Sequence, residues 1–132
     1  MSGKPNKKIL LVDDDKICNF ITEATLNRLG IASEIHAVLN GKEALEIINN
    51  FQSKDQVLPD AILLDLNMPI MNGFQFLEAF RELKISLKKE IMIIILTSSE
   101  NPEDIVKAKK FGITHFLTKP LNEKTILTLL AN

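Results

Sequence analysis

The sequence predicts an α/β protein of the (βα)₅ type, with one parallel sheet and helices on both of its faces. Short apolar runs recur at regular intervals, and segments of helical periodicity lie between them. Strands that are covered on both faces are continuously apolar, whereas a surface helix buries a single stripe. With 132 residues, the chain is long enough for one domain with its own core.

Five apolar runs are the predicted strands. The runs that begin at residues 9, 61 and 91 are continuously apolar, which is typical of strands inside a parallel sheet. No repeat or low-complexity tract interrupts the alternation. The predicted strands are Ile9–Val12, Ile35–Val38, Ala61–Leu64, Ile91–Leu96 and His115–Leu117.

Apolar residues between the predicted strands recur at helical spacing, which places them on one face of each helix. Gly30 and Gly112 suit the position after a helix C-terminus, where φ is positive. Asn72 and Asn101 are predicted N-caps, the second of them followed by proline. The predicted core-facing residues are Ile17, Phe20, Ile21 and Ala24; Ala44, Leu45, Ile48 and Phe51; Phe76, Leu77, Phe80 and Leu83; Ile105, Val106 and Phe111; and Ile126, Leu127 and Leu130.

The bulk composition excludes several classes of protein. A net charge of −1 gives no basic excess of the kind that nucleic-acid binding requires. The single cysteine, Cys18, excludes an internal disulfide framework and fits a reducing cytoplasm. The longest apolar run, Ile91–Leu96, is far too short to span a membrane. We therefore expect a cytoplasmic protein without direct nucleic-acid or membrane contact.

Polar side chains follow four of the five predicted strands at their C-terminal ends. In parallel sheets of this type, ligands bind outside the carboxyl ends of the strands. Each residue alone also has an ordinary structural explanation as an N-cap, a strand end or a solvated charge, but together they favour a site. They are Asp13 and Asp14, Asp65, Thr97 and Ser98, and Lys119.

Three carboxylates at one edge of a sheet need a partner of opposite charge. Each pair repels by roughly 1 kcal/mol at about 4 Å in water, and more where water is excluded. Mg²⁺ binds carboxylate and carbonyl oxygens and suits phosphate chemistry, in which a carboxylate can itself be the nucleophile. Lys119 would supply a positive charge and Thr97 a hydroxyl group for the phosphoryl oxygens. The sequence therefore predicts a Mg²⁺-dependent phosphoryl site.

Four motifs, LLVDDD, ILLDLNMPIMNG, IIILTSS and HFLTKP, resemble in order and spacing the response-regulator receiver domain of two-component signalling. The resemblance implies a doubly wound, flavodoxin-like sheet of strand order 2-1-3-4-5 in a three-layer α/β/α fold. It also implies a flexible leader at residues 1–6 and a receiver domain at residues 7–132. Such a domain is a signalling module with self-catalysed phosphotransfer and dephosphorylation, not a metabolic enzyme.

The resemblance implies a role for each residue at the predicted edge. Asp65 would accept a phosphoryl group from a histidine kinase or a histidine phosphotransfer protein. Thr97 would follow the phosphoryl group, and Lys119 would form an ion pair with it. The implied Mg²⁺ ligands are Asp13, Asp14, Asp65 and the backbone carbonyl of Asn67.

The resemblance extends to residues around this edge. Pro120 would form a cis peptide bond that orients the preceding lysine, and Phe116 would turn inward on activation. Asn67 and Ser99 occupy the two positions that tune the lifetime of the phosphorylated form. The implied output face is the fourth helix, fifth strand and fifth helix, from Pro102 to Leu130. It would bind a downstream protein or a second copy in a phosphorylation-dependent homodimer.

Three positions depart from the common pattern of the family. Phe116 stands where tyrosine is common, so a hydroxyl contact with a partner is lost. Asn72 replaces a more frequent aspartate and is predicted to act as a cap. Asp15 is an additional acid, which we expect in the first helical turn, where it favours the helix dipole, rather than at the metal.

Four further features have simpler interpretations. Cys18 is predicted to be a buried structural thiol. His36 and His115 lie in predicted strands, so that we expect packing or edge residues rather than phosphohistidines. The loop Met68–Met71 exposes apolar groups beside Asp65; it is either a tight loop or a kinase contact.

Two other functions fit parts of the pattern. A haloacid-dehalogenase-type phosphohydrolase would use Asp13 as nucleophile, with Asp15, Thr97 and Lys119 in the same order. That enzyme needs paired acids after the lysine, where only Glu123 follows, and it explains neither the acid after the third strand nor the NMP loop. A flavodoxin-like electron carrier shares the topology, but the chain has no Trp or Tyr to stack a flavin and no glycine-rich phosphate loop.

Because about one helix follows residue 120, we expect a stand-alone regulator rather than a fragment.

Overall fold

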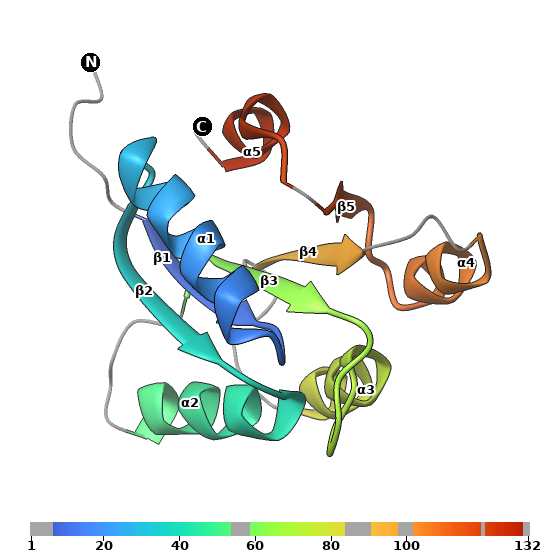
Figure 1. Ribbon diagram of the computed structural model, residues 1–132. Helices are drawn as coiled ribbons and strands as arrows, with labels where there is room; N and C mark the ends of the chain where they lie inside the picture. Colours follow the sequence, from blue (N-terminus) through green and yellow to red (C-terminus); the bar gives the residue numbers. More distant parts are fainter. Residues whose placement is uncertain (1–6, 54–58, 84–90, 98–101, 120, 131–132) are drawn as a thin grey trace.

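The computed structural model describes residues 7–53, 59–83, 91–97, 102–119 and 121–130. Strands and helices alternate, and the five strands form one sheet in the order β2-β1-β3-β4-β5. Every neighbouring pair is parallel (Figure 1), which confirms the predicted fold class and strand order. The elements are β1 (Lys7–Val12), α1 (Lys16–Arg28), β2 (Ala32–Val38), α2 (Gly41–Ser53), β3 (Ala61–Asp65), α3 (Gly73–Glu82), β4 (Met92–Thr97), α4 (Pro102–Lys110), β5 (His115–Thr118) and α5 (Glu123–Leu130).

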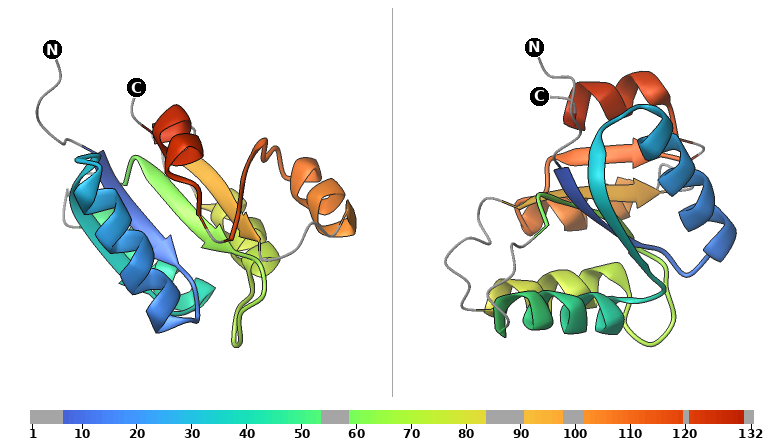
Figure 2. Two further views of the ribbon diagram at one scale, coloured as in Figure 1. Left: turned by 45° about the horizontal axis from the view of Figure 1, so that its top comes forward. Right: turned by 90° about the vertical axis from the view of Figure 1, so that its left-hand side faces the viewer.

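Two apolar layers hold the helices against the sheet. On one face, Leu26 of α1 and Ile126 of α5 pack with one set of alternating strand residues. On the other face, Ile48 of α2, Phe76 of α3 and Ala108 of α4 pack with the other set. The left view of Figure 2 shows α1 and α5 in front of the sheet. Each fully buried aliphatic or phenyl side chain contributes about 1.5–3 kcal/mol to stability.

The helix ends agree with the local sequence signals. Asn72 caps α3, and a reciprocal bond from its backbone N–H to the Gln75 side chain completes a capping box. Gly30 and Gly112 have φ values of 71° and 85°, as predicted for residues that follow a helix. The predicted cap Asn101 lies outside the described residues, and α4 begins at Pro102.

Helix α1 contradicts its predicted orientation. Its four supposed core residues are all exposed: Ile17, Phe20, Ile21 and Ala24. The side of α1 that faces the sheet instead buries Asn19, Thr22 and Leu26. A hydrophobic stripe predicts which residues share a face, but it does not say whether that face meets the core or a partner. Here the inward position near the helix start is polar because it bonds to backbone carbonyl groups.

The other helices bury seven of the predicted residues and leave Leu45, Leu83, Ile105 and Phe111 partly buried. The buried ones are Ala44, Ile48, Phe76, Leu77, Phe80, Ile126 and Leu130. Val106 and Leu127 were also predicted to face the core but are exposed. In the part of the chain that the structure describes, no helix has the length and apolar character needed to cross a bilayer.

Candidate functional site

The register of the sheet brings those predicted polar residues that the structure describes to one edge. Pairing between β1 and β3 runs in register up to residues 12 and 64, so that Asp13 and Asp65 come next on adjacent strands. At the end of β4, Thr97 pairs with residue 118 of β5. The backbone N–H of Lys119 then donates to the Thr97 carbonyl oxygen at 2.8 Å. Four residues from four strands therefore share the carboxyl edge of the sheet.

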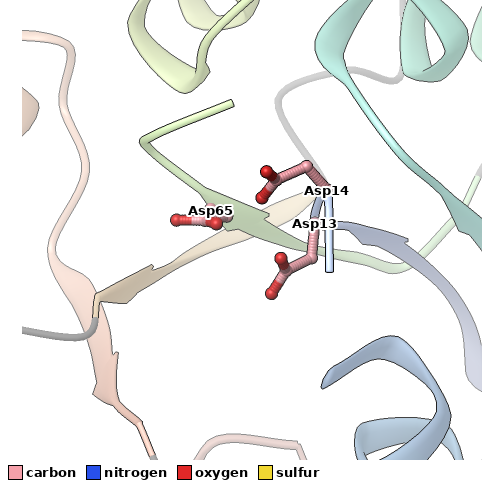
Figure 3. A group of neighbouring side chains, drawn as sticks. All are labelled: Asp13, Asp14 and Asp65. Atoms are coloured by element: carbon pink, nitrogen blue, oxygen red, sulfur yellow. The ribbon is translucent and has the colours of Figure 1, made fainter. Parts of the chain in front are cut away.

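Asp13, Asp14 and Asp65 form a carboxylate cluster at this edge (Figure 3). One carboxylate oxygen of each residue lies within 4.8 Å of the other two. Asp13 is 1% exposed and Asp65 is 8% exposed, whereas Asp14 is open to solvent. The cluster thus has two buried carboxylates and one exposed carboxylate, that of Asp14.

Lys119 supplies the counter-charge of the carboxylate cluster. Its Nζ lies 2.6 Å from Oδ2 of Asp13 and 3.5 Å from Oδ2 of Asp65. The Asp13 contact has the length of a charge-assisted hydrogen bond, and the Asp65 contact is a longer ion pair. One ammonium group therefore faces two buried carboxylates at the same time.

The electrostatic environment shifts the pKa values of the two buried acids, Asp13 and Asp65, in opposite directions. Burial raises the pKa of Asp65, and the neighbouring Asp13 adds to this effect; Lys119 and the Asn67 amide offset it only in part. Burial also opposes ionisation of Asp13, but the bonds from Lys119, the Asp15 amide and Cys18 outweigh it and hold the pKa of Asp13 below its usual value. The pKa of Lys119 is raised, because its two carboxylate partners outweigh its own burial. Of the two buried acids, Asp13 favours its charged form more than a free aspartate does, and Asp65 favours it less.

Asp15 serves helix α1 instead of the carboxylate cluster. Its Oδ1 accepts the backbone N–H groups of Ile17 at 2.9 Å and Cys18 at 3.2 Å, and it is the N-cap of α1. The sequence predicted this acid in the first helical turn, whereas in the structure it is the N-cap. A negative charge at the N-cap also interacts favourably with the helix dipole. Its own backbone N–H donates to Oδ1 of Asp13 at 3.0 Å. The cap therefore also holds the Asp13 carboxylate.

The start of α3 packs directly against the backbone of Asp65. The N–H of Gly73 donates to the Leu66 carbonyl at 3.0 Å. A Cβ atom at residue 73 would lie 2.7 Å from the Asp65 carbonyl oxygen and 2.8 Å from the Leu66 Cα. Contacts this short with backbone atoms require glycine. The sequence placed Gly73 among ordinary turn and cap positions and gave no reason to connect it with Asp65.

The connection between β3 and α3 also carries the apolar loop that the sequence singled out. Ile70 is 76% exposed and has a φ of 67°, a conformation that β-branched residues rarely adopt. Met68 is buried in the core, and Met71 packs partly against it. The loop is thus anchored by its two methionines and presents Ile70 to solvent.

The donor set of the cluster fits a hard divalent cation. Carboxylate oxygens from three residues converge, and such oxygens are the ligands that Mg²⁺ prefers. The backbone N–H of Asn67 donates to Oδ1 of Asp65 at 3.3 Å, which keeps the Asn67 peptide next to the cluster. Among His, Cys, Asp and Glu, only aspartates contribute to the cluster within the described residues, so that the site favours magnesium over softer metals.

The remaining predicted residues divide into three groups. Thr97 has its backbone at the edge and is half-buried. Phe116 is half-buried against the core under α2, α3 and α4. Ser98, Ser99 and Pro120 lie outside the described residues, so the structure bears neither on the two serines nor on the cis peptide bond predicted at Pro120.

Cys18 is only half-buried, contrary to the prediction of a buried thiol. Burial and the adjacent Asp13 carboxylate raise the pKa of its thiol to about 11. His36 and His115 are half-buried strand residues, as expected, and the ring of His36 bonds to Glu34 on the same strand. Neither histidine belongs to the carboxylate cluster.

The fold and the edge together define a doubly wound α/β protein whose polar site lies at the carboxyl ends of its strands. A family model described as "Response regulator receiver domain" matches residues 9–131, and the chain belongs to this family. The family identification agrees with the resemblance of the four motifs. Members of this family are signalling domains.

Known relatives carry the same assignment. Two-component response regulator 24 of Arabidopsis thaliana is 35% identical over 121 residues, which are 92% of this chain and 79% of that protein. Two-component response regulator ORR1 of Oryza sativa subsp. japonica is 31% identical over 130 residues, which are 96% of this chain and 55% of that protein. The chain therefore spans about half the length of the rice protein.

Solved structures of similar proteins share the architecture. A two-component response regulator from Cytophaga hutchinsonii superposes with a TM-score of 0.85 at 28% identity, covering 96% of this chain and 95% of that chain. The chemotaxis protein CheY4 of Vibrio cholerae gives a TM-score of 0.75 at 33% identity, covering 93% and 94%. The sheet order described above is therefore that of the receiver fold.

Proposed function

We propose that the protein is a phosphorelay response regulator in which Asp65 accepts a phosphoryl group from a phosphohistidine in a Mg²⁺-dependent reaction. One observation carries the proposal: the carboxylates of Asp13, Asp14 and Asp65 meet the ammonium group of Lys119 at one edge of the sheet. A nucleophilic carboxylate, an oxygen-rich cation site and a fixed positive charge are what phosphoryl transfer to an aspartate requires.

In the proposed reaction, a carboxylate oxygen of Asp65 forms a bond to phosphorus while the bond between phosphorus and the donor imidazole nitrogen breaks. The imidazole keeps the electron pair of the broken bond and takes up a proton. Lys119, at 3.5 Å from Asp65, supplies positive charge for the phosphoryl oxygens, and Thr97 supplies a hydroxyl donor.

We propose that Asp13, Asp14, Asp65 and the backbone carbonyl of Asn67 hold Mg²⁺. When bound, the ion neutralises negative charge on the phosphoryl oxygens and on the carboxylates. The low pKa of Asp13 supports this assignment, because a metal ligand must be deprotonated. Asp14 is the ligand on the solvent side.

One exposed apolar patch and one exposed apolar residue, on the segments that follow Asp13 and Asp65 in the chain, support docking of the phosphodonor, a histidine kinase or a histidine phosphotransfer protein. The first, which we call the α1 patch, consists of Ile17, Phe20 and Ile21, which are 70%, 73% and 57% exposed. It begins two residues after the cap residue Asp15. The second is Ile70 on the loop after Asp65. Contiguous exposed apolar residues next to a reactive group are typical of a protein interface.

For the phosphorylated form, we propose that α4, β5 and α5 make up the output face. Val106 on α4 is 55% exposed, and Leu127 on α5 is 38% exposed. Phe116 on β5 packs partly buried against the core, two residues before Thr118, which pairs with Thr97. A downstream protein is the proposed partner, and a second phosphorylated copy is the alternative partner for the same face.

Labelling with a small phosphodonor tests the proposal. The protein is incubated with radiolabelled acetyl phosphate, with and without Mg²⁺, beside the variants Asp65→Asn and Asp60→Asn. Asp60 is the matched control, because it lies just before β3 and binds the Lys8 amide. We expect hydroxylamine-labile label that requires Mg²⁺ and is absent from Asp65→Asn alone. Equal labelling of all three proteins would refute the proposal. Asp13→Asn is labelled alongside them, and label that persists in Asp65→Asn but is lost in Asp13→Asn would favour a phosphohydrolase.

A further inference from the structure

The sheet side of α1 contains a buried amide side chain to which the proposed function gives no part. Asn19 is 6% exposed, although its neighbour Phe20 is largely open to solvent. Its Nδ2 donates to the carbonyl oxygen of Asp13 at 3.0 Å and to that of Val38 at 3.3 Å. One side chain therefore joins α1, the residue that follows β1 and the last residue of β2.

The bond from Asn19 holds the backbone of Asp13, whose side chain belongs to the carboxylate cluster. The N–H of Asp13 also donates to the Val38 carbonyl, at 3.1 Å. On the other side, the N–H of Asn19 donates to the Asp15 carbonyl at 3.0 Å. The turn from β1 into α1 is thus closed around Asp13, and Asn19 is the side chain that binds the Asp13 carbonyl oxygen.

We infer that Asn19 is a positioning residue, which fixes the backbone of Asp13 and thereby the direction in which the Asp13 carboxylate enters the cluster with Asp14 and Asp65. This inference rests on the proposed function, because the cluster is the proposed metal site. Side chains that orient metal ligands through hydrogen bonds affect metal affinity strongly without touching the metal.

The energetics favour such a role over simple packing. A buried amide without partners is costly, so an inward-facing asparagine persists only where it finds acceptors. An apolar residue at position 19 would fill the same space against the sheet, but it would leave the Asp13 carbonyl without this donor. The polar choice therefore serves the geometry of the turn and not the core.

Magnesium affinity separates positioning from general stability. Asn19→Leu removes the donor and keeps a side chain of similar size. Thr22→Val is the matched control, because Thr22 is buried on the same side of α1 and makes no contact with Asp13 in the hydrogen bonds described. The chain has no Trp or Tyr, so binding is followed by titrating Mg²⁺ into ¹⁵N-labelled protein and recording amide NMR shifts. Thermal unfolding without metal is recorded for each variant.

We expect Asn19→Leu to raise the Kd for Mg²⁺ by about tenfold or more, as removal of a ligand-orienting bond does in other metal sites. Thr22→Val should leave the Kd within about twofold of the wild type, even where it lowers the melting temperature. A wild-type Kd in Asn19→Leu, or an equal rise in Thr22→Val, would overturn the inference. If Asn19→Leu does not fold, Asn19→Ser is judged by the same criteria. Failure of the wild type to bind Mg²⁺ would instead contradict the proposed function.

Discussion

Lys119 and Asp13 are 106 positions apart in the chain, yet the Nζ of Lys119 lies 2.6 Å from Oδ2 of Asp13. In the sheet, their strands β5 and β1 are separated by β4 and β3. The lysine therefore reaches across two strands along the carboxyl edge and passes Asp65 on the way, at 3.5 Å. This ion pair closes the site and joins the first strand to the last.

Replacement of Lys119 by glutamine should leave the repulsion between the buried carboxylates of Asp13 and Asp65 without a counter-charge. Without the ammonium group, Asp13 loses its strongest partner, and we expect the free energy of unfolding of the metal-free protein to fall by about 1–3 kcal/mol. Mg²⁺ should restore more stability to Lys119→Gln than to the wild type, because it supplies the missing positive charge. Urea denaturation with and without Mg²⁺ measures both effects, with the exposed Lys109→Gln as control. Equal stability of Lys119→Gln and wild type in both conditions would contradict this account.

Mg²⁺ affinity should depend on pH through Asp65. The pKa of Asp65 is raised by burial and by Asp13, so that protons compete with the metal at a higher pH than they do for an ordinary aspartate. Asp13 stays ionised over the same range, because its pKa is lowered. The Kd should therefore rise as the pH falls from neutrality through the raised pKa of Asp65. Magnesium titrations at a series of pH values measure this, and a Kd that stays constant until the ordinary aspartate range would argue against it.

Gly73→Ala should displace the backbone of Asp65, although residue 73 itself is not part of the carboxylate cluster. The new methyl group would meet the Asp65 carbonyl oxygen and the Leu66 Cα, both backbone atoms, and one of the two elements has to move. We expect a loss of about 1–3 kcal/mol in stability together with slower labelling by acetyl phosphate. Gly30→Ala is the control: its Cβ meets nothing within 4 Å, and its strain comes from a φ of 71°. That variant should lose stability while its labelling rate per folded molecule stays at the wild-type value.

Phe20→Ser should separate docking from chemistry. Phe20 is 73% exposed, so its loss should leave the melting temperature nearly unchanged. Phosphotransfer from a phosphorylated histidine kinase that labels the wild type should slow by about tenfold, the effect of losing one interface hot spot. Labelling by acetyl phosphate should not change. Val106→Ser, which alters an exposed residue outside the α1 patch, is the matched control; equal slowing in both variants would contradict the assigned docking surface.

The fold was largely predictable because alternation of apolar strands with amphipathic helices leaves few topologies. The edge residues followed from the same reasoning, since Asp13, Asp65 and Lys119 each end or follow a strand. Strand limits shifted by one to three residues: β1 begins at Lys7 rather than Ile9, β2 at Ala32 rather than Ile35, and β4 ends at Thr97 rather than Leu96. Such boundaries depend on neighbouring strands, which local sequence does not contain.

The orientation of α1 was not predictable from periodicity. Its apolar stripe is real, but Asp15 caps the helix so that Asn19 faces the sheet and Phe20 faces solvent. The roles of Asn19 and Gly73 also depend on contacts with residues distant in space, such as Val38 and Asp65. Local pattern identifies groups that carry charge, whereas the groups that position them become visible only in three dimensions.

The most direct measurement identifies the phosphorylated side chain itself. The protein is treated with acetyl phosphate and Mg²⁺ and then with borohydride, which reduces an aspartyl phosphate to homoserine, and its peptides are sequenced by mass spectrometry. Our account predicts homoserine at position 65 and at no other aspartate, with none when Mg²⁺ is omitted. Homoserine at position 13 or 14, or none after full exposure to the phosphodonor, would contradict it.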